Sequence, residues 1–266
     1  MEWSGFGGVR VDTDGVVNPV SGQPGPAAVP AESKPMTPSR ASRLDDQVPF
    51  LARLEHQERV ALLELGRPMK YSPRSVLVHQ DEPSTHVMVI LAGWTKVIHS
   101  AANGYEALLA LRGPGDIVGE ASAVSGRSRS ATVAALGRVE AVTIERGRFL
   151  DHLAEFPATA LQLLSLIGDR TQASDRRRVE QGALGVRERL SLLILELSRT
   201  HGVQDAEGVR LTTGLSQHEL AGAVGASREA VARLLKELRE RDIVRTSRRG
   251  LVIVRPDLLR RIGGGE

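Results

Sequence analysis

The sequence contains no cysteine among its 266 residues, and only 3% of the residues are aromatic. The absence of cysteine excludes disulfides, zinc sites with cysteine ligands, iron–sulfur clusters bound by cysteine and a cysteine nucleophile. The seven histidines show no metal-ligand spacing such as His-Glu-x-x-His. No Ser/His/Asp motif or phosphate-binding Walker loop is present either, so we expect neither a metal site nor catalytic residues.

Long apolar runs are also missing. No segment approaches the roughly 18 uninterrupted apolar residues that a membrane-spanning helix needs. The first residues, MEWSGFGGVR, do not combine a basic start with an apolar core, so they do not resemble a secretory signal. The sequence therefore predicts a cytoplasmic protein without a membrane partner.

Basic charge is concentrated near the end of the chain. The whole sequence has a net charge of +3, with 31 arginines but only 4 lysines. Residues 211–262 contain 11 basic and 6 acidic side chains, so the remainder is close to neutral. A polyanionic partner for this segment would explain the distribution, as would a genomic preference for arginine.

The N-terminal segment has the composition of a disordered tail. Residues 1–44 include SGQPGPAAVPAESKPMTPSR, which is rich in proline, glycine, serine and alanine. Such a segment cannot bury enough apolar surface to offset its loss of conformational entropy. We therefore expect the fold to begin near Asp45.

The next part of the sequence changes from helix to strand. Apolar spacing in residues 48–66 predicts short amphipathic helices. Short apolar segments separated by turn residues follow, and this pattern is typical of an antiparallel sandwich or barrel. The expected strands are Ser75–Val78, Val87–Leu91, Thr95–Ile98, Ala107–Leu111, Ala131–Ala134 and Ala141–Ile144.

Helical spacing returns from Arg148. A longer helix is expected from Ala158 to about Gln181, and another over Arg187–Thr200. One face of the longer helix begins apolar and becomes polar. This stripe contains Ala160, Leu163, Leu164, Ile167, Thr171, Ser174 and Arg178.

Residues 215–243 have the pattern of a helix-turn-helix. Ser216 and Glu219 have the spacing of a capping box at the start of a short helix. Gly225 suits the left-handed position that ends this helix, and Ser227 can cap the next one. Two short helices joined by a tight turn that contains glycine form this motif.

The second helix of the motif has side chains suited to reading DNA bases. Arg228, Glu229 and Arg233 lie near its N-terminal end, away from its apolar face. Arginine can donate two hydrogen bonds to guanine, and glutamate can accept one from cytosine. A β-hairpin follows, and Arg248 and Arg249 at its tip would contact phosphates. A charged, solvated surface helix is the alternative, and the order of caps, turn and basic hairpin argues against it.

A second motif suits a cyclic sugar phosphate. Gly119 and Glu120 precede Arg129 and Ser130, with Arg129 nine residues after Glu120. Glycine lets backbone N–H groups approach an anion, glutamate can accept from a sugar hydroxyl, and arginine can pair with a phosphate in bidentate fashion.

Together, these motifs resemble the cyclic-AMP receptor protein and fumarate–nitrate regulator (CRP/FNR) family of bacterial transcription regulators. The segment Gly119–Thr132 is similar to the phosphate-binding cassette of cyclic-nucleotide-binding domains, and Ser227–Arg233 is similar to the family's recognition helix. The resemblance extends from about Val48 to Ile262. One departure is Asp81, where the family usually has glycine in a β-turn.

The resemblance implies a role for each matching residue. Glu120, beside Gly119, would bind the ribose 2′-hydroxyl, and Arg129 and Ser130 would bind the cyclic phosphate. Ser174 would contact the adenine, with Thr171 one turn earlier as the competing residue. The residues implied in DNA binding, at half-sites similar to TGTGA, are Gln217, Ser227, Arg228, Glu229, Arg233, Arg248 and Arg249.

The expected fold class is α+β. We expect a cyclic-nucleotide-binding β-roll at residues 45–156, a long dimerisation helix at 157–184 and a winged helix-turn-helix at 185–266. The implied function is that of a homodimeric transcription regulator that binds palindromic double-stranded DNA. A cyclic nucleotide would control this binding, and cAMP is the first candidate. No covalent cofactor is implied, and RNA polymerase is an expected partner.

Two alternatives stay open. The polar sequence around Ser174 would also suit the same scaffold with another effector, or with constitutive DNA binding. An enzyme gated by a cyclic nucleotide would need a further domain, and only the N-terminal tail is unassigned.

Overall fold

The structure is a computed structural model that describes Leu44 and residues 48–247 and 250–264. Of the tail expected at residues 1–44, only Leu44 lies within the described residues, and it is buried. Its backbone N–H donates to Glu196 Oε1 at 2.9 Å, and its carbonyl oxygen accepts from the Leu111 N–H at 3.0 Å. The packed part of the chain therefore includes Leu44.

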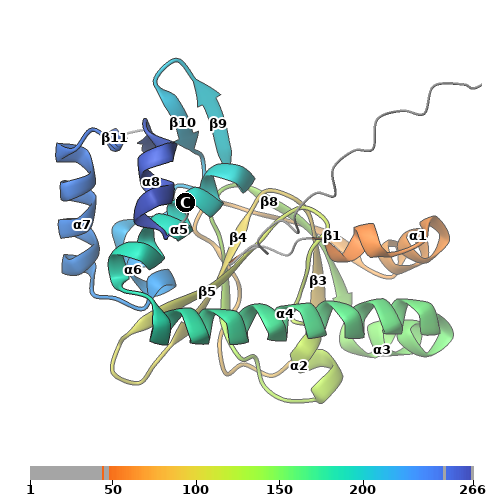
Figure 1. The fold of residues 1–266 in the computed structure, drawn as a ribbon. Helices are drawn as coiled ribbons and strands as arrows, with labels where there is room; N and C mark the ends of the chain where they lie inside the picture. The colour runs from red at the N-terminus through yellow and green to blue at the C-terminus, as the bar shows by residue number, and fades with distance from the viewer. Residues whose placement is uncertain (1–43, 45–47, 248–249, 265–266) are drawn as a thin grey trace, which may run out of the picture. The chain divides into compact units, whose positions relative to one another are not determined.

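Short helices come first, as the sequence predicted. They are η1 (Phe50–Arg53), a 3-10 helix, and α1 (His56–Glu64). Phe50 and Leu62 are fully buried in one hydrophobic cluster with strand residues such as Ile144. These helices thus cover one side of the domain that follows (Figure 1).

Within the described residues, two four-stranded antiparallel sheets form the expected β-roll. Their strand orders are β1-β8-β3-β6 and β2-β7-β4-β5. The strands are β1 (Arg67–Tyr71), β2 (Val76–Val78), β3 (His86–Ala92), β4 (Thr95–Ser100), β5 (Glu106–Arg112), β6 (Ile117–Val118), β7 (Thr132–Ala135) and β8 (Val139–Glu145). Every segment predicted as a strand overlaps one of these.

Alternating side chains place the core of the roll between the two sheets. Met88 and Ile90 of β3 pack with Val133 of β7 in one buried cluster. Val87 and Val89, on the other face of β3, pack toward the helices in a second cluster. Period-two alternation therefore gives β3 two buried faces.

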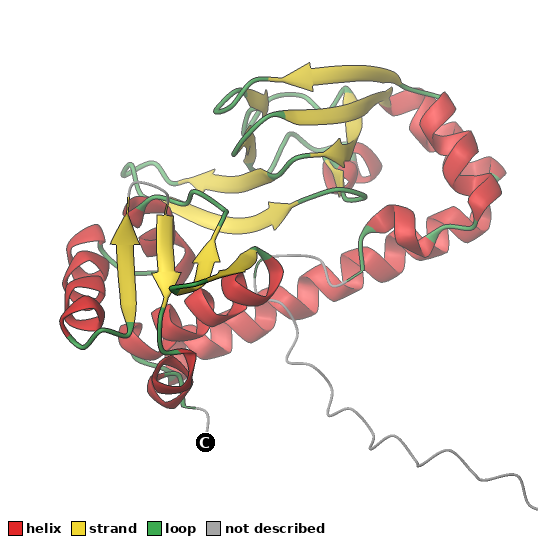
Figure 2. Cartoon of the chain, turned by 90° about the horizontal axis from the view of Figure 1, so that it is seen from above, coloured by secondary structure: helices red, strands yellow, loops and turns green. Residues whose placement is uncertain are grey.

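A single long helix, α4 (Pro157–Ala183), follows α3 (Arg146–Glu155) and runs without interruption in both views (Figures 1 and 2). Pro157 occupies its first position, where the missing N–H costs no helical hydrogen bond. Leu163 and Leu166 are buried against the β-roll, whereas Leu161 and Leu164 are each 65% exposed. The first half of α4 is therefore anchored by one stripe and leaves an apolar stripe uncovered within the described residues.

The C-terminal domain has the winged helix-turn-helix fold that the sequence predicted. Its antiparallel sheet has the order β11-β12-β10-β9, and its strands are drawn in yellow in Figure 2. Leu190, Ile194, Val231 and Leu235 lie in its buried core. The elements are α5 (Val186–Thr200), β9 (Gly202–Asp205), β10 (Gly208–Leu211), α6 (Gln217–Val224), α7 (Arg228–Glu240), β11 (Val244–Ser247), β12 (Gly250–Ile253) and α8 (Pro256–Ile262).

Helix α6 also contacts strands β4 and β5 of the β-roll. Lys96 of β4 forms an ion pair with Glu219 of α6, and both side chains are largely buried. A Cβ on Gly222 would collide with the Glu106 carbonyl oxygen, so the backbones of α6 and β5 approach closely. Leu108 and Leu111 of β5 belong to the same hydrophobic cluster as the core of the C-terminal domain.

Two kinds of feature are absent from the described residues. None of their helices is long and apolar enough to span a bilayer. In the same part of the chain, no group of three or more His, Cys, Asp or Glu side chains is placed to hold a metal ion.

Candidate functional site

A cavity of about 360 Å³ lies between the β-roll and α4. Its size falls within the range of small-molecule sites, about 300–1,000 Å³. The lining combines apolar strand residues with charged residues from α4, η1 and the segment before β7. Among the described residues it includes four of the predicted site residues, which are Gly119, Glu120, Arg129 and Ser130.

Gly119 shapes the turn that begins this site. It has φ +83°, a left-handed conformation that glycine adopts without strain. A Cβ at this position would collide with Nη1 of Arg129. Glycine therefore allows Arg129 to lie directly against the turn, immediately before helix α2 (Glu120–Ser125).

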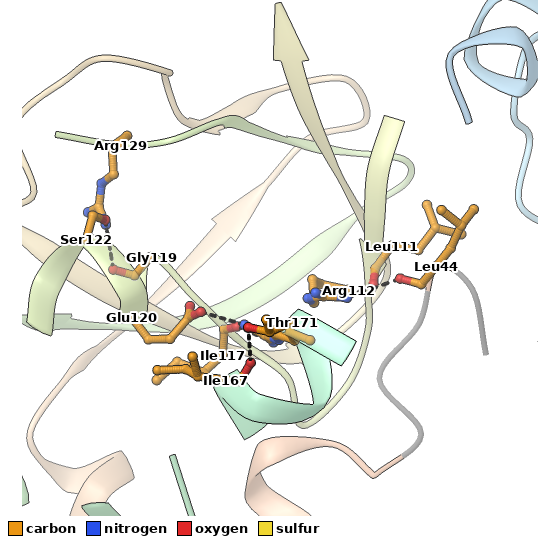
Figure 3. A network of polar contacts seen from close by, with 11 residues as sticks. Leu44, Leu111, Arg112, Ile117, Gly119, Glu120, Ser122, Arg129, Ile167 and Thr171 are labelled. Atoms are coloured by element: carbon orange, nitrogen blue, oxygen red, sulfur yellow. Dashed lines mark hydrogen bonds and ion pairs between the residues drawn. The ribbon is translucent and has the colours of Figure 1, made fainter. Parts of the chain in front are cut away.

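Glu120 is buried and already bound by a cation. Arg170 of α4 donates from Nη1 to Glu120 Oε1 at 2.6 Å and from Nη2 to the Ile117 carbonyl oxygen at 3.0 Å (Figure 3). A sugar hydroxyl that bound this carboxylate would have to share it with Arg170 or replace that contact.

Arg129 is buried and its guanidinium is held by neutral acceptors. It donates to the Gly119 carbonyl oxygen at 3.0 Å and to Ser122 Oγ at 3.1 Å (Figure 3). It also donates to the His86 carbonyl oxygen. Burial lowers the pKa of Arg129, and the charges of Glu120 and Glu82 partly offset that effect. A desolvated cation of this kind favours an anion as ligand.

The two residues expected to contact adenine lie outside the cavity lining. Ser174 is exposed, and Thr171 Oγ1 donates to the Ile167 carbonyl oxygen of its own helix at 2.9 Å (Figure 3). Residue 171 is two positions from Ala173, which lines the cavity, and therefore projects from nearly the opposite side of α4. Gln172 and Ala173 are the small or polar uncharged residues that α4 contributes instead.

The face of α4 that lines the cavity follows from the residues that anchor this helix to the β-roll. Leu163 and Leu166 are buried, and helical spacing continues their stripe through Arg170, Ala173 and Arg177. The stripe predicted from the sequence, through Thr171 and Ser174, is shifted by one residue from this inward-facing stripe. The cavity lining also contains residues that the sequence pattern did not indicate, namely Arg53, Arg112, Asp169 and Arg176.

The helix-turn-helix provides the second candidate surface. Ser216 Oγ accepts from the Glu219 N–H at 3.2 Å, and Glu219 Oε2 accepts from the Ser216 N–H at 2.6 Å, so the capping box is confirmed. Gly225 ends α6 with φ +63°, and Ser227 Oγ accepts from the Ala230 N–H at 3.1 Å at the start of α7. The turn and both caps match the sequence pattern.

Helix α7 buries one face and exposes the other. Val231, Leu235 and Leu238 are buried. Arg228, Glu229 and Arg233 are exposed on its first two turns, and Figure 1 shows α7 at the edge of the C-terminal domain. This arrangement presents hydrogen-bonding side chains at the helix end that enters the major groove in helix-turn-helix proteins.

The surrounding groups extend this surface. Gln217 is half-buried in the first turn of α6. Hydrogen bonds from its own backbone N–H and from Ser227 lower the pKa of Glu229, so its carboxylate is an acceptor at neutral pH. Strands β11 and β12 form the predicted hairpin, whereas Arg248 and Arg249 at its tip lie outside the described residues.

Comparison with known proteins matches the β-roll and the C-terminal domain to two domain families. Residues 68–156 match the family model of the cyclic nucleotide-binding domain, and residues 188–262 match that of the Crp-like helix-turn-helix domain. A Mycobacterium tuberculosis protein, named CRP-like cAMP-activated global transcriptional regulator, is 28% identical over 73% of this chain and 86% of its own length. The probable transcriptional regulator flp of Lacticaseibacillus casei is 29% identical over 75% of this chain and 89% of its own length.

A solved structure supports the same fold. The c-di-GMP responsive global regulator CLP of Xanthomonas campestris has a TM-score of 0.67 and 21% sequence identity. The match covers 75% of this chain and 99% of that protein.

Proposed function

Because the chain belongs to the CRP/FNR family of transcription regulators, we propose that a cyclic nucleotide in the β-roll cavity controls the binding of α7 to DNA. The observation that supports this most directly is the presence, in one chain, of a cavity bordered by Glu120 and Arg129 and a capped helix that exposes Arg228 and Arg233. In this proposal, residues 45–156 are the sensor, 157–184 the dimerisation helix and 185–266 the DNA-binding domain.

Within the cavity, Arg129 and Ser130 would bind the phosphate, and Glu120 would accept from the ribose. The ligand would exchange its own oxygens for the carbonyl acceptors that Arg129 now contacts and would displace Arg170 from Glu120. The name of the mycobacterial relative makes cAMP the first effector to test. Gln172 is a further polar side chain of α4 that lines the cavity.

On the DNA, Arg228, Glu229 and Arg233 would read base edges in the major groove. Gln217, Ser227 and the tip arginines Arg248 and Arg249 would contact the backbone, which adds affinity without sequence information.

The active form in this proposal is a homodimer on a palindromic site. Two recognition helices must lie about 34 Å apart to enter successive major grooves. The exposed Leu161 and Leu164 of α4, together with Val179 (69% exposed), supply an apolar stripe for the second copy. RNA polymerase remains the expected protein partner, and a cytoplasmic location stays a prediction.

The second candidate is the same DNA-binding scaffold with a different effector or with constitutive binding. The pairing of Glu120 with Arg170 favours it, because the carboxylate expected to bind ribose already has a cationic partner. The Xanthomonas regulator of the same fold, which is named as responsive to c-di-GMP, illustrates another effector.

A mobility-shift assay separates the two candidates. Duplexes selected from a randomised library by the purified protein would be titrated with and without cAMP, for the wild type and for Arg129→Ala. We expect cAMP to strengthen the binding of the wild type but not of Arg129→Ala. Arg127→Ala is the matched control, because Arg127 is exposed and does not line the cavity.

Equal DNA binding with and without cAMP would favour the second candidate. Failure to select any duplex sequence would contradict DNA binding itself.

A further inference from the structure

The cavity has far more arginine than a single phosphate requires. Among the described residues that line it, six are arginines and two are acidic, Glu120 and Asp169. We call these six the arginine cluster; they are Arg53, Arg112, Arg129, Arg170, Arg176 and Arg177. They come from η1, β5, the segment before β7, and α4, so the fold brings them together from four separate places in the sequence.

Both acidic residues of the lining are already engaged. Asp169 Oδ2 lies 2.6 Å from Arg53 Nη2, and Glu120 Oε1 lies 2.6 Å from Arg170 Nη1. Each carboxylate therefore balances one member of the cluster. The positive charge that faces the cavity then includes Arg129, Arg176 and Arg177.

Arg177 is held much as Arg129 is. It donates to the Leu109 carbonyl oxygen of β5 and, from Nε, to the Ala173 carbonyl oxygen at 3.4 Å. Burial lowers the pKa of Arg177, with partial compensation from Glu196 and Glu180. Keeping a desolvated cation against neutral oxygens is costly, and an anionic ligand would reduce that cost.

Arg176 differs because its side chain is exposed at the edge of the cavity. No hydrogen bond or ion pair of this guanidinium is found within the described part of the chain. It can therefore rotate toward a ligand without breaking an internal contact, and its planar fork suits a phosphate.

The positive charges lie at two levels of the cavity. Arg170 and Arg177 are seven residues apart, so they share one face of α4 and are separated by about 10 Å along its axis. Ala173, between them, has a side chain too small to fill the space. One level is next to Glu120 and Arg129, and the other lies beside β5 at Arg176 and Arg177.

We propose that the cavity binds an organic phosphate with at least two anionic phosphate groups. Arg129 binds one phosphate, and Arg176 and Arg177 bind the other. This inference rests on the proposed function, because it takes Arg129 as the primary phosphate site. The residues that bind the second phosphate, Arg176 and Arg177, belong to α4, which leads into the DNA-binding domain.

Three adenine nucleotides test the number of phosphates while the base stays constant. Isothermal titration calorimetry on the full chain would compare cAMP, adenosine 3′,5′-bisphosphate and cyclic di-AMP. We expect at least one of the two ligands with two phosphates to bind about tenfold more tightly than cAMP. The bisphosphate is a mononucleotide, so it tests the second charge without the bulk of a dinucleotide.

The variant Arg176→Gln isolates the second phosphate. We expect it to weaken the tighter of these two ligands by about tenfold and to change the affinity for cAMP by less than about twofold. Arg178→Gln is the matched control, because Arg178 is an exposed arginine of α4 that does not line the cavity. The affinity of the tighter ligand should also fall more steeply with salt than that of cAMP.

The outcomes distinguish this inference from the proposed function. If cAMP binds in a manner that needs Arg129 and neither ligand with two phosphates binds more tightly, the second phosphate site is refuted and the proposed function stands. Equal effects of Arg176→Gln on cAMP and on the other ligands would also overturn it. If none of the three nucleotides binds, both the cyclic-nucleotide function and this inference fail.

Discussion

Arg170 of α4 and Glu120 of the β-roll form a charged hydrogen bond of 2.6 Å at the wall of the cavity. Both side chains are largely buried, so the pair is shielded from bulk water. It joins the long helix to the residue that would bind a ribose. A ligand that bound Glu120 would therefore be linked to the position of α4 through this contact.

Loss of Arg170 should destabilise the fold. Arg170→Gln would leave the buried Glu120 carboxylate without its cation, so we expect the free energy of unfolding to fall by about 1.5–3 kcal/mol. Urea denaturation measures this change. In a double-mutant cycle with Glu120→Gln, the coupling energy should be clearly different from zero. Additive effects of the two substitutions would contradict the pairing.

Base reading by α7 predicts a loss of affinity that depends on the DNA sequence. Arg228→Ala and Arg233→Ala should each weaken binding to the selected duplex by about 1–3 kcal/mol. Fluorescence anisotropy with the selected and a scrambled duplex measures the difference. Arg260→Ala, in an exposed arginine of α8, controls for general loss of positive charge. The assignment is wrong if all three variants lose affinity equally on both duplexes.

The cap at Ser227 allows stability and DNA binding to be separated. Ser227→Ala should cost about 1 kcal/mol of stability, because the Ala230 N–H loses its acceptor. Ser227→Asp keeps an acceptor at the helix N-terminus, so its stability should stay within about 0.5 kcal/mol of the wild type. The added carboxylate should nevertheless repel phosphates and weaken DNA binding. If Ser227→Asp binds DNA as tightly as the wild type, the DNA phosphates do not lie near this end of α7.

The exposed stripe of α4 predicts the oligomeric state. Leu161→Glu combined with Leu164→Glu should convert the proposed dimer into a monomer, because each leucine would contribute about 1.5–3 kcal/mol when buried between copies. Light scattering coupled to size exclusion measures the mass. Val203→Glu is the control, because Val203 is 56% exposed in β9 of the other domain. A dimer that survives the double substitution would require a different interface.

The buried imidazole of His201 leads us to expect a loss of stability in mild acid. Its ring packs edge-on against Trp94, with centroids 4.1 Å apart, and burial lowers its pKa from 6.5 to about 4. Below about pH 6.5 the unfolded chain gains a proton that the folded His201 does not accept. Stability therefore falls between pH 6.5 and 4, by about 2 kcal/mol at pH 5 relative to neutral pH.

Denaturation at pH 7.5 and pH 5 for the wild type and His201→Gln measures this contribution. The wild type should lose about 2 kcal/mol more than the variant over this range. An equal loss in both proteins would mean that His201 is protonated in the folded state.

The fold could be predicted from the sequence wherever apolar periodicity and capping residues indicate the same helix. The helix-turn-helix is the clearest case, because Ser216, Gly225 and Ser227 fix its boundaries through local hydrogen bonds and one left-handed residue. Strand β1 was missed, because four of its five residues are exposed and its sequence, RPMKY, does not alternate. Strands β9 and β10 have only four residues each and gain their pairing from tertiary context.

The candidate site was only partly predictable, because some of its residues come together only through tertiary packing. Gly119, Glu120, Arg129 and Ser130 belong to one local segment, so their spacing indicated that they act together. Arg53, Arg112 and the α4 arginines reach the cavity from distant segments, and only the packing of Leu163 and Leu166 determines which face of α4 turns inward. A register error of one residue was enough to select Ser174 in place of Ala173.

The length of α4 makes it a lever arm. Its buried N-terminal part is fixed against the β-roll, while Ala183 at its far end leads through Gly185 into α5. From Arg170 to Ala183 the helix extends about 20 Å, so a tilt of about 5° at the cavity moves its end by about 2 Å. If the exchange of one guanidinium contact for another at Arg170 tilts α4 by that amount, geometry alone moves the start of the DNA-binding domain by about 2 Å.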